Sequence, residues 1–218
     1  MKSFKQYIYE VTTILPPSEN VPVEKTDEPK QKTAKDIAAD FITLPDVEGY
    51  KEEAYQDKGG IWTVGPGITR YSTGMAVEKG DVIPKKYGMK EMHHHLDNVV
   101  IPTLSKKIPN WNKMNDNQKA SLISFSYNAG QNFYKKKGYE TITNALSKES
   151  NWNNVPTALN LYNKGFDEVL QKKVVQPGLV KRRKNEGAIW SGTYVPPTSK
   201  PPTSKKEKVS IKPQPPLN

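Results

Sequence analysis

The first patterned segment of the chain has the spacing of one helix face. The apolar residues of 33–41 recur at i, i+3, i+4 and i+7, namely at Ala34, Ile37, Ala38 and Phe41. Thr33 followed by Asp36 is a start signal, because such side chains satisfy the free N–H groups of a first helical turn. Pro45 limits how far a helix continues without a break. The pattern predicts an amphipathic helix that begins at about residue 33.

The pattern changes between about residues 50 and 71. The run AYQDKGGIWTVGPGITRY is rich in Gly, Thr and Tyr, and its apolar residues alternate over short distances. Gly59 and Gly60 stand between two β-prone runs. A glycine pair in this position predicts a β-hairpin with its turn there.

Helical periodicity dominates again over residues 85–189. In the run ASLISFSYNAG, for example, Leu122, Phe125 and Ala129 share one face, and Gly130 is a natural C-terminal stop. The order is therefore a helix, a small sheet and then several helices. This order predicts the α+β fold class.

Both ends of the chain differ from this body. Residues 1–32 carry four prolines and balanced charges, which predicts an extended or disordered leader, although its first ten residues are also compatible with a short amphipathic turn. Residues 192–218 repeat PPTSK in tandem and continue as KKEKVSIKPQPPLN. Proline fixes φ and removes a hydrogen-bond donor, so neither helix nor sheet propagates here. We expect a folded domain over 33–191 and a disordered tail over 192–218.

The composition adds charge and redox information. Hydrophobic residues make up only 34% of the 218 residues, which agrees with unpacked ends. Lys and Arg number 33 against 23 Asp and Glu, a formal charge of +10, of which the tail contributes +4. This surplus favours polyanionic partners such as nucleic acid, acidic lipid or anionic wall polymer. The chain has no cysteine, which excludes disulfides, thiol catalysis and cysteine zinc sites.

Two kinds of membrane segment are not expected. No stretch approaches the roughly 20 apolar residues of a membrane helix. The N-terminal run MKSFKQYIYEVTTILPP is interrupted by polar residues, whereas the apolar core of a signal peptide is a continuous block of about 7–15 residues. We predict neither a membrane span nor a signal peptide, so action outside the membrane would need another component for release.

Candidate chemistry is concentrated in residues 48–67. Glu48 is expected at the end of the first helix, Asp57 at the hairpin turn and Thr63 on the returning strand. Two carboxylates around one cleft suit glycoside hydrolysis, in which one donates a proton and the other activates water. A threonine hydroxyl can hold that water. From the residues alone, a solvated charged turn is the simpler interpretation.

The run EGYKEEAYQDKGGIWTVGPG resembles the signature E-G-x5-Y-x-D-x5-T-x-G-x-G of the phage-type lysozymes, and every spacing agrees. Two later blocks are similar to that family's endolysin branch: NDNQKASLISFSYNAG over 115–130 and PGLVKRRKNEGAIW over 177–190. KKYGMKEMHHHLDNVV occupies the place of the family's long helix. The resemblance covers about residues 37–190.

The resemblance implies a lysozyme-like fold, with a small β-hairpin lobe, a larger helical lobe and the active-site cleft between them. It implies that Glu48 is the general acid, that Asp57 acts on the opposite side of the sugar and that Thr63 helps to place the water. The expected activity is that of an N-acetylmuramidase, which cleaves the β-1,4 bond between N-acetylmuramic acid and N-acetylglucosamine. Because a held water needs room between the carboxyl groups, we expect inversion.

Two further residues are candidates for binding substrate. Tyr55 lies two residues before Asp57, hence on the same strand face, and is the better cleft aromatic. Asn128 either hydrogen-bonds an N-acetyl sugar or caps its helix. No metal or organic cofactor is expected, because this chemistry needs only carboxylates and water.

The implied biological role is that of a phage endolysin, a monomer that acts on peptidoglycan. It would wait in the host cytoplasm until a holin pore releases it. Two alternatives stay open: a tail-associated virion lysozyme docked through its leader, and a catalytically silent, basic wall-binding protein on the same scaffold. No specific nucleic-acid partner is expected. The basic tail either attracts anionic wall or outer-membrane polymer or is an inert linker.

Three other features bear on the site. Arg182 and Arg183 precede Glu186 by one helical turn, so one of them either orients Glu48 or joins a surface ion pair. His93–His95 cannot share one metal on an intact helix, because consecutive residues point about 100° apart. Many relatives have His where this chain has Ile68, which puts substrate preference in doubt more than the reaction type.

Overall fold

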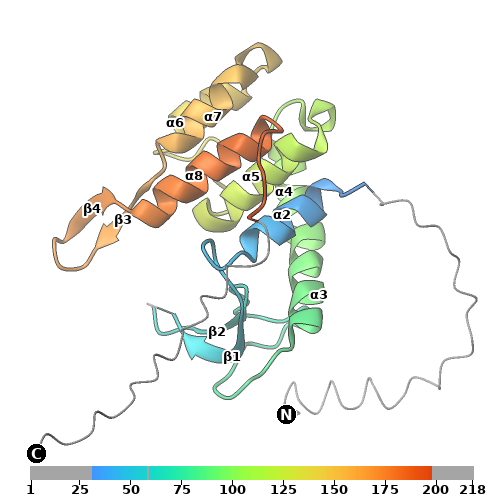
Figure 1. The fold of residues 1–218 in the computed structure, drawn as a ribbon, viewed down its shortest axis with the longest axis vertical. Helices are drawn as coiled ribbons and strands as arrows, with labels where there is room; N and C mark the ends of the chain where they lie inside the picture. Colours follow the sequence, from blue (N-terminus) through green and yellow to red (C-terminus); the bar gives the residue numbers. More distant parts are fainter. Residues whose placement is uncertain (1–30, 58, 198–218) are drawn as a thin grey trace, which may run out of the picture.

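The computed structural model describes residues 31–57 and 59–197 and confirms the α+β class. A large helical lobe stands above a small lobe built on one hairpin (Figure 1). The helices are α2 Ala34–Ile42, α3 Lys85–His95, α4 Ile101–Lys107, α5 Asp116–Ala129, α6 Glu140–Leu146, α7 Val155–Asn160 and α8 Pro177–Trp190. Short helical turns cover Leu96–Val100, Trp111–Lys113 and Glu149–Asn154. The strands are β1 Lys51–Gln56, β2 Trp62–Gly65, β3 Lys164–Asp167 and β4 Lys172–Val175.

The predicted first helix is confirmed as α2. The Thr33 side chain accepts from the Asp36 backbone N–H, and the Asp36 side chain accepts from that of Thr33. This reciprocal capping box satisfies two of the donors that a helix start leaves free. The apolar face of α2, with Ala38, Phe41 and Ile42, is buried against α5 in the core of the helical lobe.

The small lobe has a core of its own. Strands β1 and β2 form the antiparallel hairpin expected around Gly59 and Gly60, with Tyr55 opposite Thr63. Behind it, a separate group of buried side chains is formed by Val64, Ile68, Tyr71, Val77 and Ile83. The two separate cores give two lobes, as expected for a lysozyme-like chain.

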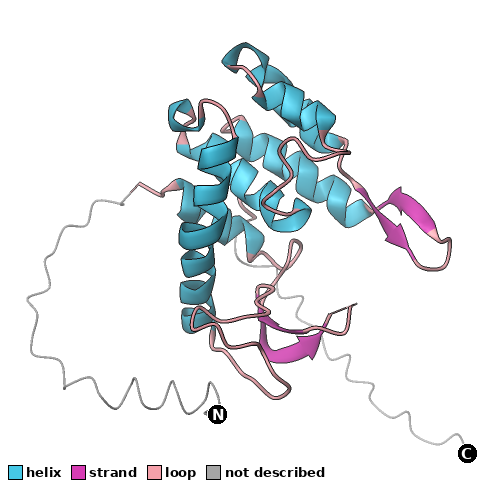
Figure 2. Ribbon diagram, turned by 180° about the vertical axis from the view of Figure 1, so that it is seen from behind, coloured by secondary structure: helices cyan, strands magenta, loops and turns pink. Residues whose placement is uncertain are grey.

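One long helical rod joins the lobes. Helix α3 passes through a π-helical turn, Leu96–Val100, directly into α4 (Figures 1 and 2). Pro102 lies in the first turn of α4 and has no N–H to donate, so the regular hydrogen-bond ladder is interrupted there. The Ile101 N–H instead reaches Leu96 O, five residues back. Among the described helices, none is long and apolar enough to cross a membrane.

Helices dominate residues 85–189, as predicted, but one segment of this range forms strands that the sequence reading missed. Strands β3 and β4 form a second antiparallel hairpin directly before α8, and it projects from the helical lobe (Figure 2). Its turn is held by Asp167, whose Oδ1 accepts from the N–H groups of Val169 and Leu170. An aspartate that binds the backbone in this way favours a turn over a helix. Most apolar side chains of the hairpin are exposed, namely Phe166, Val169, Leu170 and Val175, so no buried stripe marked it in the sequence.

The first residues of the predicted tail contact the body. The Thr193 N–H donates to Ala188 O, and the Tyr194 ring meets Phe41 edge to face at 5.4 Å between centroids. The polyproline-like segment predicted after them lies outside the described residues, as does the leader up to residue 30.

Gly88 of α3 lies in close contact with Tyr50, in the loop before β1, and a substitution at Gly88 can test this packing. A Cβ at Gly88 would overlap the Tyr50 side chain, whose Cζ would stand 2.8 Å away and whose hydroxyl donates to Ile83 O at 3.0 Å. We expect Gly88→Ala to lower the free energy of unfolding by about 1–3 kcal/mol, because Tyr50 must move. In urea unfolding, Gly178→Ala is the matched control: its added Cβ meets no atom within 4 Å. An equal effect of the two substitutions would contradict this packing.

Candidate active site

The sequence had suggested that Glu48 lies at the end of the first helix. In the structure it lies instead in a loop that folds back onto the end of that helix. Helix α2 ends at Ile42, and turns around Pro45 follow it. The Glu48 N–H donates back to Ile42 O at 3.1 Å, and the Gly49 N–H donates to Leu44 O at 3.0 Å. Gly49 has a φ of 71°, a left-handed conformation that favours glycine. The turn after Glu48 therefore explains why glycine follows glutamate in the motif.

Asp57 lies at the hairpin turn, as expected. Its Oδ1 accepts from the N–H groups of Gly59 at 2.8 Å and Ile61 at 2.9 Å. The turn thus fixes the carboxylate through one oxygen. In the described part of the chain no hydrogen bond engages Oδ2, so this oxygen is free to act on a ligand.

Thr63 is buried on β2, with 4% of its surface exposed. Its hydroxyl donates to Ile61 O at 3.0 Å. A hydroxyl has one proton and two lone pairs, so this contact leaves Thr63 as an acceptor. A water molecule at Thr63 would have to donate to it.

Tyr55 lies beside both carboxylates. It pairs with Thr63 across the hairpin. Burial raises the pKa of the Tyr55 hydroxyl, and the negative charges of Glu48 and Asp57 raise it further. The Lys51 ammonium stands over its ring at 3.9 Å. Tyr55 therefore lies close to both carboxylates, and its role as a cleft aromatic stays a prediction.

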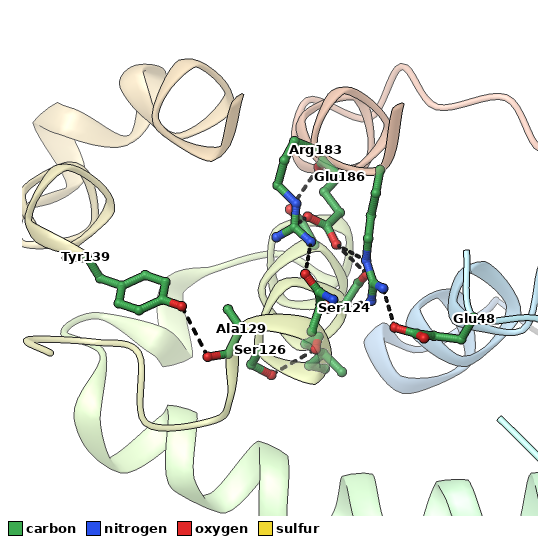
Figure 3. Close-up of polar contacts among 11 residues, drawn as sticks. Glu48, Ser124, Ser126, Ala129, Tyr139, Arg183 and Glu186 are labelled. Carbon is green, nitrogen blue, oxygen red and sulfur yellow. Dashed lines mark hydrogen bonds and ion pairs between the residues drawn. The ribbon is translucent and has the colours of Figure 1, made fainter. Parts of the chain in front are cut away.

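The structure identifies Arg182 as the arginine that meets Glu48. Its Nη1 forms an ion pair with Glu48 Oε1, while its other nitrogens bind inside the helical lobe. The Arg182 side chain is 4% exposed and that of Glu48 is 32% exposed. Glu48 thus carries a buried cation on one side and is open on the other. Figure 3 shows Glu48 approaching the cluster formed by Ser124, Arg183 and Glu186.

Among the described residues, no hydrogen bond joins Asn128 to the three proposed catalytic residues. It is exposed near the end of α5, and its Oδ1 accepts from Arg183 Nη2 at 2.9 Å. The helix is capped by Gly130, so this side chain is engaged by Arg183 and not as the cap. It lines a hollow of about 580 Å³ whose walls also include Lys137, Lys164 and Lys173.

A second hollow, of about 530 Å³, lies between the lobes. Its walls come from the loop 67–74 and from the α3 and α5 regions, and they include His94, His95 and Tyr127. The Tyr127 hydroxyl donates to Pro66 O at 2.8 Å and so ties the two lobes together. Burial lowers the pKa of His95, which favours its neutral form. Sequence reasoning gave these residues no site role.

Several other features bear on the sequence expectations. Ile68 is 9% exposed and lines the same hollow, so an apolar group stands where many relatives have His. In the described part of the chain, no group of three His, Asp or Glu side chains could hold a metal ion. Sequence reasoning also missed Ser124. Ser124 is fully buried and contacts Glu186 of α8, and the sequence alone shows neither its burial nor this contact.

Comparison with known proteins gives the family. The phage lysozyme profile matches residues 45–186. No curated protein sequence matches the chain significantly. Among solved structures, an endolysin from Escherichia coli O157:H7 phage FAHEc1 is 24% identical, with a TM-score of 0.61 over 79% of this chain and 99% of that one.

Two other solved structures share the fold. A point mutant of P22 lysozyme is 23% identical, with a TM-score of 0.57 over 71% of this chain and 94% of its own. The muramidase domain of SpmX from Asticaccaulis excentricus is 17% identical, with a TM-score of 0.56 over 70% and 93%. The profile covers more than half of the chain and includes Glu48, Asp57 and Thr63. The chain therefore belongs to the phage lysozyme family.

Proposed function

We propose that this protein is a muramidase that hydrolyses the β-1,4 bond between N-acetylmuramic acid and N-acetylglucosamine in peptidoglycan. The observation that carries the proposal is the placement of Glu48, with a buried arginine on one side and an open side next to Tyr55. Asp57 and Thr63, on the adjoining hairpin, supply the second carboxylate and a water acceptor. Retention of all three groups argues against the silent wall-binding alternative.

The proposed reaction is a single displacement. Protonated Glu48 gives its proton to the glycosidic oxygen as the bond from that oxygen to the sugar C1 breaks. A water that donates to Thr63 attacks C1 from the opposite face, and Asp57 takes the proton that this water loses. Arg182 stabilises the carboxylate that Glu48 becomes. The product has inverted configuration at C1.

We propose the endolysin role, with storage in the host cytoplasm until a holin pore opens. Support comes from the family and from the neighbour named as an endolysin. The tail-associated alternative depends on the leader, most of which lies outside the described residues. Mass spectrometry can compare the amount of this protein in purified virions with the amount in late-infection lysate. An endolysin should be found in the lysate and not in the virions, whereas a tail-associated lysozyme should be found in the virions.

Glu48→Gln tests the proton donor. An amide cannot deliver the proton, so we expect lysis of permeabilised Gram-negative cells to fall by at least about 10²-fold, the lower range of general acid catalysis. Glu52→Gln is the matched control, because Glu52 is exposed on β1 in the same segment. Both variants should stay folded, and Glu52→Gln should melt near the wild type, whereas Glu48→Gln loses the ion pair with buried Arg182 and should melt below it. Activity of Glu48→Gln within a few-fold of wild type would remove Glu48 from the role.

The stereochemistry tests the role of Thr63 and Asp57. If they hold the attacking water, NMR of the first-formed reducing end should show the α-anomer. A β-anomer, or a sugar covalently bound to Asp57, would exclude direct displacement by water.

The tail residues 198–218 test the proposed attraction to anionic polymer. They carry five lysines and one glutamate, a net charge of +4. Their deletion should leave turnover of small soluble wall fragments unchanged and weaken activity on intact sacculi at low salt. The difference should close as salt rises, because the screening length is about 8 Å at physiological ionic strength. Superimposable salt curves for the two proteins would support an inert linker.

A further inference from the structure

One buried carboxylate, Glu186, is shared by two arginines of its own helix. None of its surface is exposed. Oε1 accepts from Ser124 Oγ at 2.7 Å and from Arg182 Nε at 3.1 Å. Oε2 forms an ion pair with Arg183 Nη1 at 3.0 Å. Oε1 is thus engaged by two hydrogen bonds, whereas Oε2 has an ion pair but no hydrogen-bond partner among the described residues, and all of these groups are buried in the helical lobe (Figure 3).

The contacts of Arg182 fix the orientation of its guanidinium group. Nε donates to Glu186, and Nη2 donates to Ser124 O at 3.1 Å. A guanidinium is planar, so two bonds to fixed groups determine where its remaining donors point. The remaining nitrogen, Nη1, is the one that meets Glu48.

Glu186 is a buried acidic group that lies between two buried guanidinium groups. Burial raises its pKa, while Arg183, Arg182 and Ser124 act in the opposite direction. The pKa of Glu186 therefore lies above its ordinary value, and the two guanidinium groups oppose its neutralisation. Removing one partner from such a cluster leaves an uncompensated buried charge, so its members would rearrange.

We propose that Glu186 is a positioning residue of the active site, which acts through Arg182 to aim Glu48 at the glycosidic oxygen. The inference rests on the proposed function. Glu186 touches neither substrate nor the reacting atoms. Its loss would misplace Glu48 through Arg182 and so lower the rate of the chemical step. Binding of the glycan, which takes place on the open side of Glu48, is affected much less.

The main experiment compares kcat and KM of Glu186→Gln with wild type on soluble wall fragments. We expect kcat to fall by about 10–100-fold, as when a group that orients a directly acting residue is lost, with KM within about threefold. Leu146→Ala, a cavity variant at a buried position of α6, is the control for lost stability and should keep its kcat below its melting temperature. Wild-type kcat in Glu186→Gln would overturn the proposal.

A charge-compensated variant separates positioning from folding. Glu186→Gln combined with Arg183→Met removes one negative and one positive charge, so stability should recover relative to Glu186→Gln. Arg182 still lacks its anchor, so kcat should stay at least about tenfold below that of Arg183→Met alone. If kcat recovers together with stability, Glu186 has a structural role only. If neither charge variant folds, Glu186→Asp decides, because it keeps the acidic group but draws the carboxylate away from Arg182 Nε: kcat equal to wild type would count against the proposal.

A spectroscopic measurement keeps this inference distinct from the proposed function. In ¹⁵N NMR, the Arg182 Nε–H should exchange slowly in the wild type and rapidly in Glu186→Gln. If wild type cleaves, Glu48→Gln does not, and Glu186→Gln keeps full kcat, only the positioning role fails. If wild type does not cleave, the proposed function fails, and unchanged exchange at Arg182 would reject the anchoring by Glu186 as well.

Discussion

The guanidinium of Arg182 is the contact on which the geometry of the site depends. It joins Glu48, in the loop after α2, to Ser124 on α5 and Glu186 on α8. A buried arginine is stable only when its charge and its donors are satisfied. The packing of α5 on α8, which brings Ser124 and Glu186 together, therefore also fixes where the proposed general acid stands.

The small lobe supplies the other half of the site under a different constraint. Its hairpin is held by its own core and by the Asp57 carboxylate, which binds the backbone of the turn. Asp57 thus has a structural role through one oxygen and a proposed chemical role through the other. The Tyr127–Pro66 hydrogen bond and the rod from α3 to α4 are the links that relate this hairpin to Arg182.

Much of this arrangement could be predicted from local chemistry. The capping box of α2, the glycine pair of the hairpin and the spacing of Glu48, Asp57 and Thr63 are all sequence-local, and the structure contains the predicted helix and hairpin. The choice between Arg182 and Arg183 could not be made, because both lie one turn from Glu186 and only tertiary packing separates them. Strands β3 and β4 were missed since most of their apolar residues face solvent.

The described body also begins and ends at one place. Lys32, just before α2, and Pro196, after α8, line the same small hollow, together with Phe41 and Tyr194. Ends that lie close together are a common condition for circular permutation. A short linker could join them, and the projecting turn between β3 and β4 offers a site for new ends. In such a permutant Glu186 and Arg182 would precede Glu48 along the chain, with their contacts unchanged.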